Sequence, residues 1–273
     1  MSSPVSASTD AAPSRTGALS PVLLGLVGLL GFAALIELLP RLGIVRPEYF
    51  PPTSAIANSL YDQLQRPQFW AAFGHTALTW STGLAIAVVS GIVLGLVIGS
   101  VPFLRAATSS TVEFLRPIPS VALIPLVVVL LGTGMRSTLV LVVYASFWQV
   151  LVQVLYGVAD VDPVASETAR SYRLGRWARM RYLVWPTTLP YAMTGIRLAA
   201  SVALILTITG EFFIGTPGLG REIDIAYTSN AVPTMYGLIV VTGLIGVVAN
   251  VVTRGAERVV LRWHPSVRRD VIA

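Results

Sequence analysis

Long apolar runs dominate the pattern of hydrophobic and polar positions along this chain. A helix needs about 20 mostly apolar residues to cross the hydrocarbon core of a bilayer. The sequence holds six runs of suitable length, each bounded by charged residues, proline or glycine. The pattern therefore predicts an all-α, polytopic membrane protein with six transmembrane helices. The expected spans are Leu19–Leu39, Thr76–Gly99, Thr108–Leu131, Thr138–Val158, Leu189–Gly210 and Tyr236–Thr253.

The composition agrees with a protein that lives in a membrane. Hydrophobic residues make up 54% of the 273 positions and charged residues 12%, whereas a soluble domain carries about 25% charged residues. So few charges cannot cover the surface of a soluble protein, and so many apolar residues exclude a disordered chain. The sequence has no cysteine, which excludes disulfides and thiol chemistry.

The arginine residues indicate how the spans are oriented. All 19 basic residues are arginine, and with 13 acidic residues they give a formal net charge of +6. Basic residues near helix ends stay in the cytoplasm. With both termini cytoplasmic, 12 of the 19 lie on the inner side, five in outer loops and two within spans. We therefore expect cytoplasmic N- and C-termini. The positive charge is a topology signal, and nucleic-acid binding is excluded.

This orientation divides the chain into three parts. Residues 1–17 are polar and rich in Ser, Ala and Pro, and we expect them to form a disordered cytoplasmic tail. Residues 18–253 form the six-helix transmembrane domain, which includes a cytoplasmic loop at 159–188. Residues 254–273 are expected to form a cytoplasmic C-terminal tail.

The 159–188 loop is too long for a simple turn, and most of it is compatible with helix. Asp162 before Pro163 is an arrangement typical of a helix N-terminus, so we expect a first short helix ending near Tyr172. A second short helix is expected after Gly175 and before Pro186.

Residues in this loop resemble the cytoplasmic motif of permease subunits of bacterial ABC importers. The family pattern is Glu-Ala-Ala, three residues, Gly, nine residues, Ile-x-Leu-Pro. Glu167 and Pro186 lie 19 positions apart, as the pattern requires. The departures are Thr168 for Ala, Arg173 for Gly and Trp185 for Leu. Because the family's glycine makes the bend between two short helices, we expect Gly175 to supply that bend here.

Three further segments are similar to the subfamily that imports sulfonates, taurine, nitrate and pyrimidine precursors. One is the third span, another the first outer loop, and the last an outer loop that follows Glu211. Together with the loop motif they cover roughly residues 45 to 265. The segments are Glu113–Leu126 with Gly132–Gly134, Tyr49–Ser54, and Gly218–Gly220.

The resemblance implies a type I ABC importer permease in the bacterial plasma membrane, working with two ATP-binding subunits and an extracytoplasmic solute-binding protein. It also implies a second permease copy, as a homodimer. The sequence has no G-x-x-x-x-G-K-S/T phosphate loop. ATP and Mg²⁺ are therefore expected on the partner subunits, with no cofactor, metal or catalytic residue on this chain. The implied solute is a small organic anion or related compound: a sulfonate, taurine, nitrate, an aromatic acid or a vitamin precursor.

The same resemblance assigns the 165–186 segment to contact with the ATPase subunit. Glu167 is the expected polar contact, Ala169 the small residue that permits close approach, and Pro186 a rigid joint. The arginines have two interpretations: contact with the ATPase subunit, or contact with anionic lipid headgroups that holds the loop inside. The expected coupling residues are Glu167, Thr168, Ala169, Arg170, Arg173, Gly175 and Pro186.

Charged and proline residues single out the third span as a candidate translocation path. Glu113 and Arg116 are three residues apart and share a helix face. They fit either a structural ion pair or a positive potential that attracts an anionic solute. Pro117, Pro119 and Pro125 each lack a backbone donor. They predict a bent or broken span, which is either a gating helix or a structural kink.

Two other protein classes explain less of the sequence. A rhomboid-type intramembrane protease needs a histidine facing its serine, yet no expected span holds a histidine beyond the boundary residue His75. A secondary transporter or channel would show internal repeats or paired intramembrane acids. Neither class accounts for the spacing from Glu167 to Pro186.

Overall fold

The computed structural model describes residues 21–263, and within that range all regular secondary structure is helical. The chain divides after residue 55 into two units. In the first, α1 (Pro21–Arg41) is tied to the segment that follows it. Glu37 accepts hydrogen bonds of 2.9 Å from the backbone N–H and from the hydroxyl of Ser54, and it forms an ion pair with Arg41. The tail expected at 1–17 lies outside the described residues.

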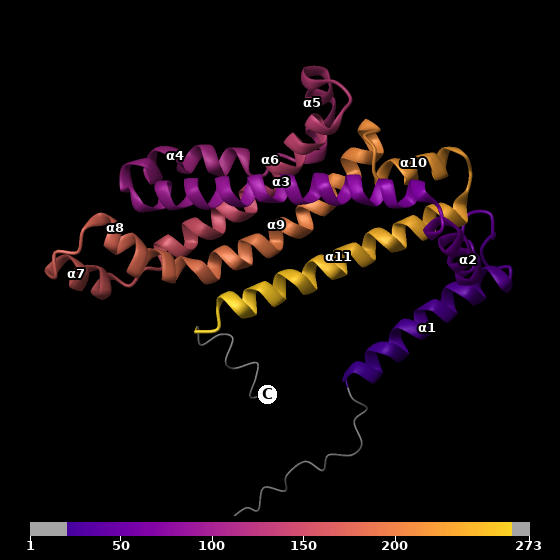
Figure 1. Ribbon diagram of the computed structural model, residues 1–273, viewed down its shortest axis with the longest axis horizontal. Helices are drawn as coiled ribbons and strands as arrows, with labels where there is room; N and C mark the ends of the chain where they lie inside the picture. The colour runs from indigo at the N-terminus through magenta and orange to yellow at the C-terminus, as the bar shows by residue number, and fades with distance from the viewer. Residues whose placement is uncertain (1–20, 264–273) are drawn as a thin grey trace, which may run out of the picture. The chain divides into compact units, whose positions relative to one another are not determined.

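The second unit is a bundle of long helices, with α2 (Thr53–Leu64) continuing into it from the first unit. Figure 1 shows α7 and α8 at one end of this bundle and α10 at the other. The remaining elements are α3 (Pro67–Ser100), α4 (Pro102–Leu115), η1 (Ser120–Leu123), α5 (Ile124–Leu131), α6 (Met135–Ala159), α7 (Pro163–Ser171), α8 (Arg176–Arg179), the π-turn η2 (Met180–Val184), α9 (Trp185–Ile214), α10 (Leu219–Thr228) and α11 (Val232–Val260).

Five helices of the described chain are long and apolar enough to cross a membrane, and a bent pair makes a sixth if it is counted as one span. In that pair, α4 and the η1–α5 segment meet at 82°. Pro117 and Pro119 lie in the break, as the missing backbone donors predict. Pro125 instead occupies the first turn of α5, where a proline is tolerated. At the other end of the chain α11 continues to Val260, so the expected tail begins as helix.

Close packing of α3 against α6 forms the centre of the bundle. Small residues recur at every fourth position of α3, and valines recur with matching spacing on α6. Because the offset between facing residues is constant, the two helices run parallel. A Cβ on Gly95 would lie 2.6 Å from Cγ1 of Val154, so only glycine permits this approach. The small residues are Gly83, Ala87, Gly91, Gly95 and Gly99, and the valines facing the glycines are Val142, Val150, Val154 and Val158.

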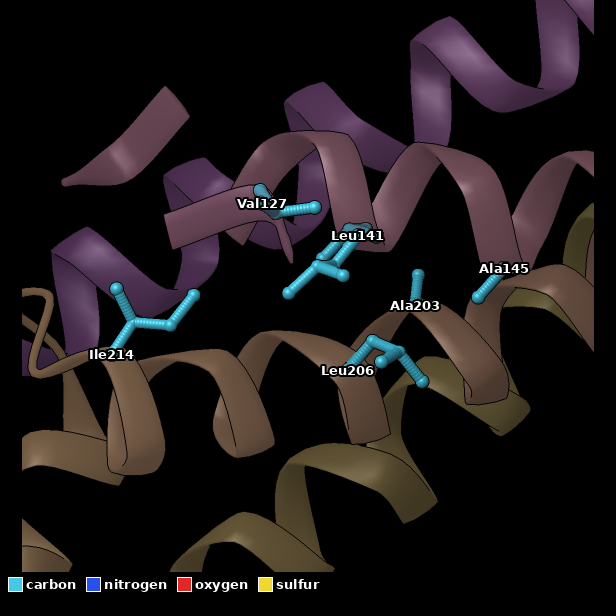
Figure 2. Packing of buried hydrophobic residues seen from close by; sticks show 7 residues of the cluster. Val127, Leu141, Ala145, Ala203, Leu206 and Ile214 are labelled. Carbon is cyan, nitrogen blue, oxygen red and sulfur yellow. The ribbon is translucent and has the colours of Figure 1, made fainter. Parts of the chain in front are cut away.

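A second set of glycines brings α6 close to α9, which runs antiparallel to it. A Cβ on Gly157 would lie 2.8 Å from the Cα of Thr188, and one on Gly210 would lie 2.7 Å from Cγ2 of Thr138. α6 is therefore the central helix, with α3 and α9 against two of its faces. Figure 2 shows part of this core, in which Leu141 and Ala145 of α6 lie near Ala203 and Leu206 of α9, beside Val127 of α5 and Ile214.

We predict that Gly95→Ala destabilises the protein, because the added methyl overlaps Val154 and forces the central helices apart. Overpacking of this kind costs about 1–3 kcal/mol, which thermal unfolding in detergent would register as a lower Tm. Gly74→Ala, on the same helix with open space around it, is the matched control and should leave Tm unchanged. Adding Val154→Ala to Gly95→Ala should restore part of the loss. Equal Tm values for the two alanine variants would contradict the packing argument.

Candidate functional site

The first helix of the 159–188 loop begins where the sequence predicts. α7 has Asp162 as its N-cap, and Oδ1 of that residue accepts a hydrogen bond of 2.8 Å from the backbone N–H of Val164. Pro163 occupies the first helical position, where its missing N–H costs nothing. The predicted start of this helix is therefore confirmed.

α7 ends at Ser171, with Tyr172 as its C-cap, as predicted, but the bend that follows it differs from the prediction. Arg173 has φ of +54°, in the left-handed region, whereas Gly175 has φ of −61° and an extended backbone. The N–H of Leu174 donates to the carbonyl of Ala169 at 3.0 Å, and that of Arg173 to Arg170 at 2.8 Å. This pair of bonds is a Schellman motif, which needs a left-handed residue at the position of Arg173. The expectation that Gly175 supplies the bend is wrong: the bend stays where the family pattern has its glycine.

The residues of α7 that are expected to contact the ATPase subunit lie on two faces of the helix, one exposed and one buried. Glu167, Thr168 and Arg170 are exposed, and Ala169 is buried. The carboxylate of Glu167 makes no hydrogen bond or ion pair with another part of the described chain. α7 is tied to the next helix by a hydrogen bond of 3.2 Å from Nη2 of Arg179 to the hydroxyl of Ser166. The helix therefore presents an unpaired carboxylate outward from a fixed support.

The second helix of the loop does not end at Pro186. α8 passes through the π-turn η2 directly into α9, so that Arg176–Ile214 is one helical segment of 39 residues. A π-turn is a common way for a helix to absorb an irregularity in its hydrogen-bond ladder, and this one lies directly before Pro186. Pro186 is therefore part of a continuous helix. The loop and the span that follows it form one rod.

We predict that Arg173→Gly stabilises the end of α7, because the left-handed conformation costs a non-glycine residue about 1–2 kcal/mol. Hydrogen exchange at the amides of Arg173 and Leu174 should slow. Gly175→Ala is the matched control: its backbone is not left-handed and open space surrounds it, so exchange should not change. Faster exchange in the Gly175 variant, with no change in Arg173→Gly, would place the bend at 175 after all.

Charges on α4 line a cavity instead of pairing with each other. No ion pair joins Glu113 to Arg116 in the described structure. Of the two interpretations of their spacing, the structural ion pair is therefore not found. Both side chains are exposed. They line a cavity of about 460 Å³ between α4, α3 and α6, together with Arg105, Thr108 and Ser109. Arg105 precedes the expected span and was not among the predicted path residues, although its helical spacing to Ser109 and Glu113 places it on the same face.

At the α10 end of the bundle, a buried carboxylate joins three helices. Oε2 of Glu211, on α9, accepts hydrogen bonds of 2.9 Å from the hydroxyl of Thr76 and from the N–H of Gly220. The hydroxyl of Thr76, on α3, accepts a third bond of 2.8 Å from the N–H of Leu219. A Cβ on Gly218 would overlap the carboxylate of Glu211. Glu211 and the Gly218–Gly220 segment, which the sequence comparison with the subfamily singled out, therefore pack directly against each other.

The solved structures that resemble this fold belong to ABC transporters. The chain is similar to one from an inward-facing conformation of the MetNI methionine ABC transporter, with a TM-score of 0.61, 17% identity, and coverage of 72% of this chain and 99% of that chain. It is also similar to one from an amino acid ABC transporter with histidines, with a TM-score of 0.54, 20% identity, and coverage of 72% and 94%. The fold is that of a type I ABC importer permease, a multi-pass plasma-membrane protein.

The family follows from the sequence comparison. The chain belongs to the family described as binding-protein-dependent transport system inner membrane component, whose model matches residues 91–263. It is 27% identical to the taurine transport system permease protein TauC of Escherichia coli (strain K12), over 83% of this chain and 84% of that protein. It is also 27% identical to the bicarbonate transport system permease protein CmpB of Synechocystis sp. (strain ATCC 27184 / PCC 6803 / Kazusa), over 82% and 84%.

Proposed function

We propose that this chain forms the solute path of an ATP-driven importer and receives force from a separate ATPase subunit through α7. The observation that carries the proposal is the single rod from Arg176 to Ile214. A displacement of α7 and α8 would reach the far end of the bundle along this rod, which stays helical through the π-turn and Pro190. α7 and α8 are in turn joined through Arg179 and Ser166.

The exposed surface of the loop supports an ATPase partner at this end. Tyr172 is 80% exposed and Trp177 77% exposed, close in sequence to the exposed carboxylate of Glu167. Exposed aromatic residues beside a charged group are typical of a protein interface. Two ATP-binding subunits, each holding its own ATP and Mg²⁺, would then dock on two permease copies, with a solute-binding protein at the opposite face. In this proposal ATP is hydrolysed on the partner subunits.

The cavity beside α4 supports an anionic solute. Arg105 and Arg116 line it with one opposing carboxylate, from Glu113, and with hydroxyl groups of Thr108 and Ser109. Unpaired charges inside a membrane are costly and are retained where they face water or a solute. The lining is net positive, and its donors suit a small anion. The relatives named for taurine, bicarbonate and nitrate agree with such a solute.

We predict that Glu167→Arg abolishes transport without preventing membrane insertion. Reversal of an interface charge leaves the ATPase subunit facing a like charge, which should weaken its copurification about tenfold or more. Uptake and solute-stimulated ATP hydrolysis should be lost together. Glu48→Arg, at an exposed carboxylate far along the chain from the loop, is the control and should retain the ATPase subunit. Normal uptake by the Glu167 variant would refute the assignment of α7.

We predict that Arg116→Gln lowers uptake of an anion, because it removes positive charge from the cavity while keeping a hydrogen-bond donor. Radiolabelled taurine, bicarbonate and labelled nitrate serve as probes, each first tested with the unaltered complex. The uptake rate should fall about tenfold, with the ATPase subunit still bound. Arg136→Gln, an exposed arginine on α6 that does not line the cavity, should transport normally. Full anion uptake by the Arg116 variant would exclude this cavity from the path.

A further inference from the structure

Glu211 is buried where three helices meet, and the transport cycle proposed above gives it no role. Only 1% of its surface is exposed, and it is the one ionisable residue in the core of the described chain. Burial of a carboxylate is costly unless donors surround it. Here one oxygen, Oε2, accepts two bonds, and Oε1 accepts none within the described structure. A group this costly needs a function that an apolar residue would not serve.

The carboxylate caps a helix that belongs to another part of the chain. The first N–H groups of a helix have no partner within it, and negative charge is favoured beside them. At α10 these groups are the N–H of Leu219, which donates to Thr76, and that of Gly220, which donates to Glu211. Side chains from α3 and α9 thus hold the first turn of α10, and Thr76 links the two by its own bond to Glu211.

Tight backbone packing keeps the cap in this position. Gly220 has no room for a Cβ, because the carbonyl of Ile208 on α9 and the Cβ of Glu211 lie against it. Thr216, in the segment between α9 and α10, is within hydrogen-bond distance of Thr138 of α6, at 3.1 Å. The start of α10 and the segment just before it therefore contact all three central helices of the bundle. It cannot shift away from α9 without losing these bonds.

We propose that Glu211 and Thr76 form a clamp that makes α10 move with α9. The clamp lies near the end of the 39-residue rod, which is roughly 58 Å long at 1.5 Å per residue, and α7 and α8 lie at its other end. Movement that enters at α7 is delivered through the clamp to α10. Glu211 and Thr76 are thus positioning residues for transport. The movement rests on the proposed function, whereas the clamp rests on the bonds to α10 alone.

Hydrogen exchange tests whether the clamp holds α10 in place. Thr76→Val removes the hydroxyl at nearly constant volume, and exchange at the Leu219 and Gly220 amides should rise about tenfold, as expected for a lost buried hydrogen bond. Thr76→Ser keeps the hydroxyl and should restore protection. Thr79→Val is the matched control, since Thr79 is buried one turn further along α3 and its hydroxyl bonds to neither Glu211 nor α10. Unchanged exchange in Thr76→Val would overturn the clamp.

Cysteine labelling tests whether the clamp transmits movement, and the sequence has no cysteine to interfere. Tyr227→Cys on α10 and Tyr182→Cys on η2 replace exposed side chains. In nanodiscs with the ATPase subunit, the maleimide labelling rates at both positions should change between the nucleotide-free state and ATP with vanadate. In the Thr76→Val background, the change at 182 should persist and the change at 227 should be lost. Glu211→Gln, which keeps an acceptor oxygen, should give a partial loss.

The outcomes separate the two proposals. If position 227 still responds in Thr76→Val as it does in the unaltered chain, or if both positions lose their response together, the clamp does not transmit movement and the inference is overturned. If neither position responds in the unaltered chain, the proposed function fails. The exchange measurement then still decides whether the clamp exists.

Discussion

Close approach of α3 to α6 is the constraint on which the other contacts of the bundle depend. Lipid tails are as apolar as leucine side chains, so helices gain little from leaving them and must gain from close packing instead. Glycine at every fourth position of α3 permits that packing, because a valine ridge of α6 occupies the space where side chains would be. α9 packs against another face of α6 through Gly157, Gly195 and Gly210. These three helices form the frame that carries the rest.

One continuous helix connects two features that lie far apart in the bundle. In the proposed cycle, the loop of α7 and α8 acts on the span that follows it, and the helix from Arg176 provides that connection. The start of α10 is held against the same helix at its other end, through Glu211. A proline at 186 would break a helix interior elsewhere, but here it follows a π-turn and the helix stays continuous. It also continues past Pro190, which lies inside α9.

The sequence predicts the elements that depend on local chemistry. Apolar length predicts the spans, Asp162 before Pro163 predicts the start of α7, and two prolines predict the break in the third span. It fails at one local turn and at one contact between residues far apart in the chain. Arg173 is held in the left-handed region by the Schellman bonds to Ala169 and Arg170, so the nearby Gly175 is not needed. The bond from Thr76 to Glu211 joins residues 135 positions apart, and no local sequence pattern predicts it.

Charged residues of the long helices fall into two groups: those bonded to other protein groups and those without a partner in the described structure. Glu211 accepts bonds from Thr76 and Gly220, and Arg197 of α9 pairs with Glu257 of α11 at 3.1 Å. These groups are satisfied by the protein, so they serve to hold helices together. Glu113 and Arg116 have no such partner in the described structure and face a cavity instead. Because an unpaired charge in a membrane persists only where water or a solute reaches it, the missing partners support the proposed solute path and set these two charges apart from the structural charges of the bundle.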